Sequence, residues 1–267
     1  MVEPHVIEID ARGLSLREIN TQLRATAERI CDNGAQDTEE IVLLHPAAQH
    51  NLGVGMVHPV KLTIRGSGGY FCMGLCDGPT VRVEGNVGWG FADNLLSGRM
   101  VVDGNAGAVC GVGMRDGDLL IRGNLGSRAG QVMKGGSIVC CGRAGHAAAS
   151  MMMGGMVVIL GDAQDALGQF IMDGEIYVAG GVASLGEDAT QADLEPKNIE
   201  TIELLLDQHE LRPPVPVRQF KKIISDQRAL RYQEYEKGEL LFEKAQEEKA
   251  EAGVADGNRD VMTFDSD

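Results

Sequence analysis

A glycine recurs every 19 residues through the middle of the chain, and this period limits the folds that the sequence can adopt. It closes a short apolar stretch at seven positions: Gly66, Gly85, Gly104, Gly123, Gly142, Gly161 and Gly180. In stretches such as "KLTIRG" and "TVRVEG", every second side chain is apolar, which is typical of a β-strand. No copy contains an insertion or a helical segment, so the period predicts a β-solenoid rather than a leucine-rich repeat.

Small residues occupy two further positions of the repeat. One column of glycines stands just before the strands: Gly98, Gly117, Gly136, Gly155 and Gly174. Turns at such places often require a positive φ, which glycine adopts most easily. A second column is always small: Ala92, Gly111, Gly130, Ala149 and Gly168. With three small corners in each coil, we expect an all-β fold, a right-handed β-helix of about seven 19-residue coils.

The signature Gly-Asn-x-Gly begins at Gly85, Gly104 and Gly123 and allows two interpretations. A phosphate-binding glycine loop occurs once, between a strand and a helix, whereas this signature recurs with no helix behind it. We therefore interpret it as structural. Its asparagines share one corner column, where stacked side chains can hydrogen-bond along the solenoid and tolerate a left-handed backbone: Asn86, Asn105 and Asn124.

Residues 1–58 differ from the repeat and predict a small α/β cap, followed by the β-helix over residues 59–188. The stretch "HVIEID" predicts a strand, "SLREINTQLRATAERI" a helix and "EEIVLLHP" a second strand. Ser15 and Glu18 form a capping box at the start of the helix. An open solenoid end leaves backbone groups unpaired, so we expect this segment to cover the first coil.

A C-terminal helical extension is expected over residues 189–252, and an acidic, disordered tail over residues 253–267. Its first helix, "EPKNIETIELLLDQHEL", turns four apolar side chains inward: Ile199, Ile202, Leu205 and Leu206. The extended linker "RPPVPV" follows, and residues 217–252 predict one long, charged helix. That helix is either a solvated element or an arm that docks on a larger partner.

The charge of −15 argues against a nucleic-acid partner and against an anionic membrane surface. No apolar run is long enough for a membrane helix, and "MVEPHVIEID" lacks the features of a secretory signal. Six cysteines, two of them adjacent at Cys140 and Cys141, do not resemble a disulfide framework. We therefore expect a reducing, cytoplasmic setting.

No residue stands out as catalytic, cofactor-binding or metal-binding. Cys72 and Cys76 lack the spacing of a zinc or iron–sulfur site, so we interpret them as core or corner thiols. Three histidines share one irregular segment without metal-ligand spacing: His45, His50 and His58. The run Met151–Met153 is interpreted as adaptable packing.

Stacked charges raise the alternative of a carbohydrate-cleaving β-helix enzyme. Glu84 and Asp103 would lie on adjacent coils, between Arg65 and Arg122. Opposite charges one coil apart can simply neutralise each other. Because the repeat contains no loop that could build a substrate groove, the sequence disfavours such an enzyme.

One outward-facing column is apolar over five coils: Val101, Leu120, Val139, Val158 and Tyr177. These residues, here called the outer stripe, alternate with core residues and must point away from the interior. A soluble monomer seldom exposes such a patch. Either the C-terminal helix covers the outer stripe, or the outer stripe is a partner interface.

The chain resembles the GXGXG β-helix domain that closes the large subunit of glutamate synthase. The resemblance rests on "GYFCMGLCDGPTVRVEGNVGWGFADNLLSG" (69–98), on the 19-residue register and on "IYVAGGVASLGED" (176–188). It covers about residues 10–212. The separate β-helix subunit of N-methylglutamate synthase, and of related split glutamate-synthase-like complexes, is the nearer match.

The resemblance implies a non-catalytic scaffold in a glutamine-dependent oxidoreductase complex of nitrogen metabolism. A class II glutamine amidotransferase subunit and an FMN-binding synthase subunit with an iron–sulfur cluster are the implied partners in a hetero-oligomer. Val2 rather than cysteine follows Met1, and no cluster-type cysteine spacing occurs, so both chemistries are expected on those partners. No cofactor is expected on this chain.

Two other interpretations stay open. The β-helix subunit of formylmethanofuran dehydrogenase, and its counterpart in the bacterial formyltransferase/hydrolase complex, resemble this chain in the Gly-Asn-x-Gly repeat. The third interpretation is a standalone adaptor that docks partners along the outer stripe.

Overall fold

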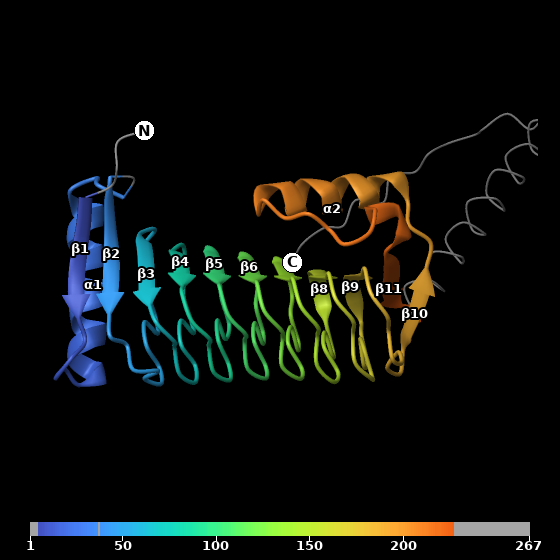
Figure 1. Cartoon of the computed structure of the whole chain (residues 1–267), viewed down its shortest axis with the longest axis horizontal. Coiled ribbons are helices and arrows are strands. Elements are labelled where there is room, and N and C mark those ends of the chain that lie inside the picture. Colours follow the sequence, from blue (N-terminus) through green and yellow to red (C-terminus); the bar gives the residue numbers. More distant parts are fainter. Residues whose placement is uncertain (1–4, 37, 227–267) are drawn as a thin grey trace, which may run out of the picture. The chain divides into compact units, whose positions relative to one another are not determined.

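The computed structural model describes residues 5–36 and 38–226, and these residues form a single β-solenoid (Figure 1). One sheet contains 11 strands in the order β1-β2-β3-β4-β5-β6-β7-β8-β9-β11-β10. The solenoid strands are β3 (Lys61–Arg65), β4 (Thr80–Val83), β5 (Arg99–Val102), β6 (Asp118–Ile121), β7 (Ser137–Cys140), β8 (Met153–Ile159) and β9 (Asp173–Val178). Each pairs with the next in parallel. The predicted solenoid of about seven coils is confirmed.

The two alternating apolar columns of the repeat form the core. Leu62, Val81 and their equivalents in the later coils are at most 1% exposed. The column two residues further on, from Ile64 to Val178, is fully buried. A second side of the solenoid stacks through single parallel bridges, such as that between Val87 and Ala106. Sequence alternation therefore reports which side chains face the interior.

The small corner columns have the backbone geometry that favours glycine. The glycines before the strands all have positive φ, from 78° at Gly136 to 112° at Gly98. The Ala/Gly column also has positive φ in every copy, including 55° at Ala92 and 56° at Ala149. An L-residue in this conformation is strained by its own Cβ, which explains the preference for glycine, while Ala92 and Ala149 adopt the conformation despite a Cβ.

The asparagine column forms the predicted hydrogen-bonded ladder. The Oδ1 atom of Asn86 accepts from the backbone N–H of Asn105 at 2.8 Å, and Asn105 Oδ1 accepts from Asn124 N–H at 2.8 Å. Each of these asparagines thus satisfies a backbone donor of the following coil. The expectation of a left-handed backbone is wrong here, because none of the three has a positive φ. Their function is side-chain hydrogen bonding.

The N-terminal segment extends the same sheet. β1 (His5–Asp10) pairs in parallel with β2 (Glu39–Leu44), which pairs in parallel with β3. Helix α1 (Leu16–Asp32) begins with the expected capping box, in which Ser15 N–H donates to Glu18 at 2.8 Å. Its buried side chains, among them Ile19 and Leu23, join the solenoid core. The helix thereby covers the apolar interior at the β1 end (Figure 1).

The C-terminal part departs from the predicted helical extension. β10 (Ala189–Ala192), α2 (Pro196–Gln208), the short 3₁₀ helix η1 (Val217–Gln219) and β11 (Lys221–Ser225) follow the last coil. β11 lies antiparallel between β9 and β10, so the helix predicted from residue 217 is wrong at its start. The segment forms a strand because it hydrogen-bonds to the otherwise unpaired backbone at the edge of β9 and buries Ile223 in the core. The rest of the predicted long helix and the acidic tail lie outside the described residues.

Neither of the two α-helices in the described ranges combines the length and apolar character that crossing a membrane requires.

Candidate functional site

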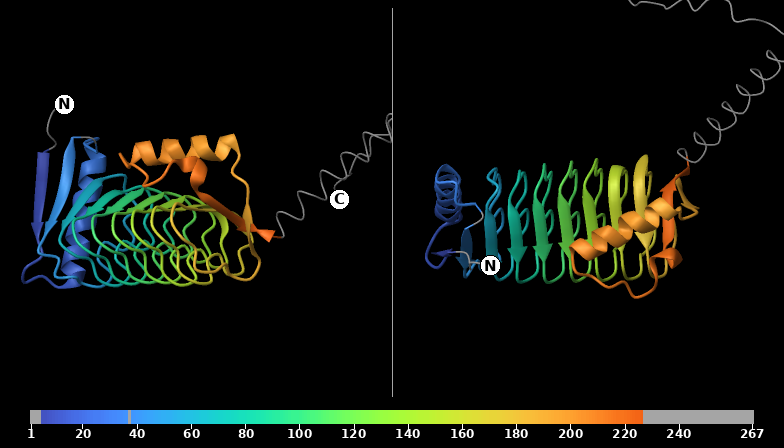
Figure 2. Two further views of the ribbon diagram at one scale, coloured as in Figure 1. Left: turned by 45° about the vertical axis from the view of Figure 1, so that its right-hand side comes forward. Right: turned by 90° about the horizontal axis from the view of Figure 1, so that it is seen from above.

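The outer stripe lies under helix α2. Leu120, Val139, Val158 and Tyr177 are at most 1% exposed, and they form one apolar cluster with side chains of α2 and η1. The cluster partners include Ile202, Leu205, Leu206, Val217 and Phe220. Figure 2 shows α2 lying across the strands of these coils. Val101, at one end of the stripe, is half-buried and packs against the same cluster.

Of the two alternatives for the outer stripe, the structure therefore shows coverage by the chain's own helix. The four residues from Leu120 to Tyr177 have no surface left for a partner. The amphipathic pattern of α2 explains the docking, since Ile202 and Leu206 face the sheet while Leu204 is 57% exposed on the opposite side.

A polar network around the buried His209 holds the end of α2 on the sheet. Arg99 of β5 donates from Nη2 to the Gln208 carbonyl at 2.8 Å and to Nδ1 of His209 at 2.9 Å. Because an arginine can only donate, Nδ1 accepts and the imidazole proton is on Nε2. Nε2 lies 3.0 Å from Asp118 Oδ1 on β6, which also accepts from Ser137 of β7 at 2.6 Å. Three strands thus fix one helix end.

This network sets the ionisation of Asp118. Burial alone would raise the pKa of its carboxyl group, but the hydrogen bonds from His209 and Ser137, together with the charge of Arg99 nearby, outweigh burial and lower the pKa. A carboxylate with a lowered folded-state pKa stabilises the fold above its unfolded-state pKa. That contribution is lost as pH falls through the folded-state value.

We therefore expect Asp118→Asn to lower the free energy of unfolding at pH 7 by about 1.5 kcal/mol, the size of one charge-assisted hydrogen bond. The difference between Asp118→Asn and the unmodified chain should shrink as pH falls below about 4. Urea unfolding at a series of pH values measures it. Asp165→Asn is the control, because Asp165 forms an exposed pair with His146 at 2.8 Å. Equal effects of the two substitutions at pH 7 would contradict the role of Asp118 in holding α2.

A second network joins α2 to the last strands. Lys222 of β11, 7% exposed, donates to Asn198 Oδ1 at 2.9 Å and lies 3.3 Å from Glu175 Oε1. The Tyr177 hydroxyl donates to Glu175 Oε2 at 2.6 Å. Sequence reasoning missed both networks, because their members come from distant parts of the chain.

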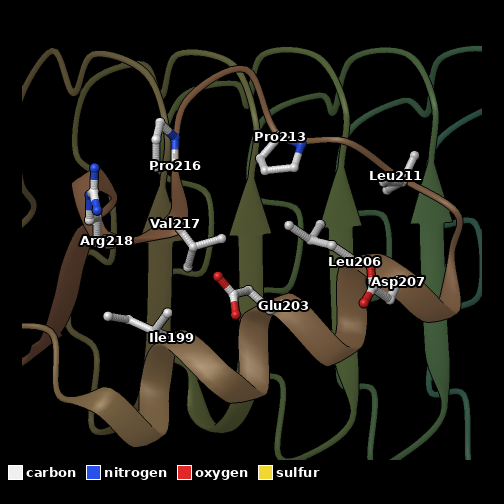
Figure 3. A pocket seen from close by; sticks show the side chains of 9 residues that line it. All are labelled: Ile199, Glu203, Leu206, Asp207, Leu211, Pro213, Pro216, Val217 and Arg218. Atoms are coloured by element: carbon white, nitrogen blue, oxygen red, sulfur yellow. The ribbon is translucent and has the colours of Figure 1, made fainter.

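A pocket lies between α2 and the linker that follows it (Figure 3). It has a volume of about 560 Å³, and apolar side chains such as Leu206, Pro213 and Val217 line it. Glu203 and Asp207 contribute carboxylates, and Arg218 lies at one end. The pocket brings together no nucleophile with a base, so its chemistry favours binding over catalysis.

The residues weighed for catalysis do not converge. Asp103 pairs with Arg82 and Arg122, at 2.9 and 3.4 Å, so its charge is offset by two arginines. Neither Glu84 nor Arg65 takes part in these pairs. His45 pairs with Asp10, whereas His50 accepts from the backbone of Tyr70. Within the described ranges, no group of three or more His, Cys, Asp or Glu residues is arranged to hold a metal ion.

Four of the six cysteines are unsuited to nucleophilic chemistry. Cys72, Cys76, Cys110 and Cys140 are fully buried in the core. Burial raises the pKa of Cys76 to about 11 and that of Cys110 to about 12, which keeps both thiols protonated at neutral pH. This agrees with their interpretation as core thiols.

Two exposed apolar features were not anticipated from the sequence. Met152 is buried, but Met151 and Met153 are 39% and 40% exposed, so the interpretation of this run as packing holds only for its middle residue. Tyr70 stacks on His50 and on Trp89, with ring centroids 4.5 and 5.7 Å apart, and Trp89 is 58% exposed. The 19-residue period of the sequence places Tyr70 and Trp89 at the same position of neighbouring coils. Only the structure shows that their side chains point outward.

Comparison with known proteins adds two findings. Residues 45–234, more than half of the chain, match the family described as "GXGXG motif". A 94-residue region is 37% identical to Protein GlxC of Rhizobium meliloti (strain 1021). That region amounts to 35% of this chain and 39% of GlxC, so the similarity spans about two fifths of the relative's length.

Proposed function

Because this chain belongs to the GXGXG motif family, the family of the glutamate synthase C-terminal domain, we propose that it is a non-catalytic scaffold subunit. Its complex would be a glutamine-dependent, glutamate-synthase-like oxidoreductase, with N-methylglutamate synthase as the type. A cytoplasmic setting is part of the proposal. The observation that carries it is the uninterrupted solenoid, in which four thiols are fully buried, Asp103 is held in ion pairs and no insertion builds an active site.

The division of labour follows from the same reasoning. Glutamine hydrolysis needs an activated nucleophile, and reduction of an imine needs a redox cofactor. We assign the first to a class II amidotransferase subunit and the second to a synthase subunit that binds FMN and an iron–sulfur cluster. A stiff solenoid suits the task of holding two such subunits at a fixed spacing, because each coil hydrogen-bonds to its neighbours along its length.

Co-purification tests the proposal. The full chain, tagged and expressed at its natural level in its own cells, should recover an amidotransferase subunit and a flavin-containing subunit. The isolated complex should form glutamate-type products from glutamine, while the chain by itself shows no turnover. Recovery with formyltransferase subunits and without flavin would support the formyl-transferring complex instead. Recovery of the lone chain would contradict both assignments.

A further inference from the structure

An exposed column of side chains runs along the solenoid close to the start of each strand, and its chemical character changes from coil to coil. The column passes through Arg115, Lys134, Met153 and Met172, one in each of four successive coils. Backbone hydrogen bonds hold this register, as Lys134 N–H donates to the Met114 carbonyl and Met153 N–H to the Met133 carbonyl. Neighbouring members of the column therefore lie about 4.8 Å apart along the solenoid.

The last two coils expose an apolar cluster on this side. Met153 and Met172 are 40% and 50% exposed, and beside them Met151 and Phe170 are 39% and 43% exposed. Met151 and Phe170 are themselves coil neighbours, because Met151 N–H donates to the carbonyl of Gln169 at 2.7 Å. Four adjacent large apolar side chains are characteristic of a protein-binding surface, and methionine adapts well to varied partners.

The two preceding coils place cations in the same column. Arg115 and Lys134 are exposed, and within the described ranges neither side chain pairs with a carboxylate. Asp116 and Asp173 lie beside the column, and each accepts from the backbone N–H of the next residue at 2.8 Å. Two exposed cations that form no ion pair within the described ranges, in a chain of charge −15, favour an acidic partner at this place.

We propose that this surface, the Met–Lys face (Arg115, Lys134, Met151, Met153, Phe170 and Met172), docks a partner-protein segment with apolar side chains at one end and carboxylates at the other. The face extends over three coil steps, about 14 Å, which matches roughly ten residues of helix. The inference rests on the proposed function, because only a scaffold subunit requires a surface that contacts its partners. The buried outer stripe does not provide one.

Photo-crosslinking in living cells tests the Met–Lys face directly. The full chain carries p-benzoylphenylalanine in place of Met153, and mass spectrometry identifies the crosslinked peptide after irradiation. We expect a peptide of another protein with at least two large apolar and two acidic residues within about ten positions. The control position is Gln164, an exposed residue elsewhere on the solenoid. Crosslinks to a second copy, to residues 227–267 of the same chain, or no more product than at Gln164 would each overturn the inference.

Charge reversal tests the cationic half. The double variant Arg115→Glu/Lys134→Glu should recover the crosslinked partner at least tenfold less than the unmodified chain, and added salt should weaken recovery. Arg65→Glu/Arg143→Glu changes the charge equally at other sites of the solenoid and should retain the partner. Undiminished recovery with the first variant overturns the inference. Circular dichroism confirms that both variants are folded.

The outcomes separate the two proposals. If the amidotransferase and flavin subunits co-purify but the Met153 crosslink fails, the function stands and the Met–Lys face is wrong. If the crosslink reaches an acidic, apolar segment of an unrelated protein, the face stands and the proposed complex is wrong.

Discussion

Leu120→Asp is expected to lower the free energy of unfolding of the isolated chain by about 3–5 kcal/mol. Leu120 is 1% exposed and lies in the cluster that α2 closes over the sheet. The substitution removes apolar contacts and places a carboxylate among buried apolar side chains, so both effects act in the same direction. Denaturant unfolding followed by circular dichroism measures the change.

Leu204→Asp provides a matched control for this prediction. It makes the same chemical change on α2 itself, but Leu204 is 57% exposed and faces away from the sheet. Its effect should stay below about 0.5 kcal/mol, as for other surface substitutions. If Leu120→Asp left the isolated chain as stable as Leu204→Asp does, α2 would not cover the outer stripe in solution. The stripe would then be available to a partner again.

The repeat made most of the solenoid predictable because its information is local. Period-two alternation identified Leu62 and Ile64 as inward residues, and the 19-residue spacing carried that assignment through every later coil. The capping box at Ser15 marked the start of α1 in the same local way. Each of these signals lies within a few residues of the feature that it predicts.

The errors arose where distant segments meet. The sequence around Lys222 and Ile223 is charged and suits a helix, yet pairing with β9 and β10 makes it a strand. Likewise, the sequence identified the residues of the outer stripe but not what covers them. The bond between His209 and Asp118 joins residues 91 positions apart, and no periodicity of the sequence reports it.

The exposure of side chains at the corners of the coils also could not be predicted from the local sequence. Met151 and Met153 share their local sequence with the buried Met152, and only the path of the backbone from the turn into β8 directs them outward. Met151 itself has a φ of 54°, an unusual conformation for this residue type. The Met–Lys face therefore became visible only when neighbouring coils were placed side by side.

Gly123→Ala is the substitution expected to damage the solenoid most directly. A Cβ atom at this position would lie 2.6 Å from the Gly104 carbonyl oxygen and 2.8 Å from its carbonyl carbon. Both are backbone atoms of the preceding coil, and Gly104 and Gly123 are joined by a 2.9 Å hydrogen bond. The preceding coil cannot move away to make room for the Cβ without lengthening this hydrogen bond and the side-chain hydrogen bond between Asn105 and Asn124 beside it. We expect a loss of about 3 kcal/mol, at the upper end of the cost of overpacking.

Gly74→Ala separates this steric effect from the general cost of replacing a glycine. Gly74 is also buried in a solenoid turn, it has no positive φ, and its nearest neighbour to an added Cβ is 3.5 Å away. Its replacement should change the free energy of unfolding by less than about 0.5 kcal/mol, because alanine also restricts the unfolded chain. Thermal and urea unfolding of both variants measure the difference. Comparable stability of Gly123→Ala and Gly74→Ala would show that close approach of the backbones does not explain the recurrent glycine, and the 19-residue column would then need another cause.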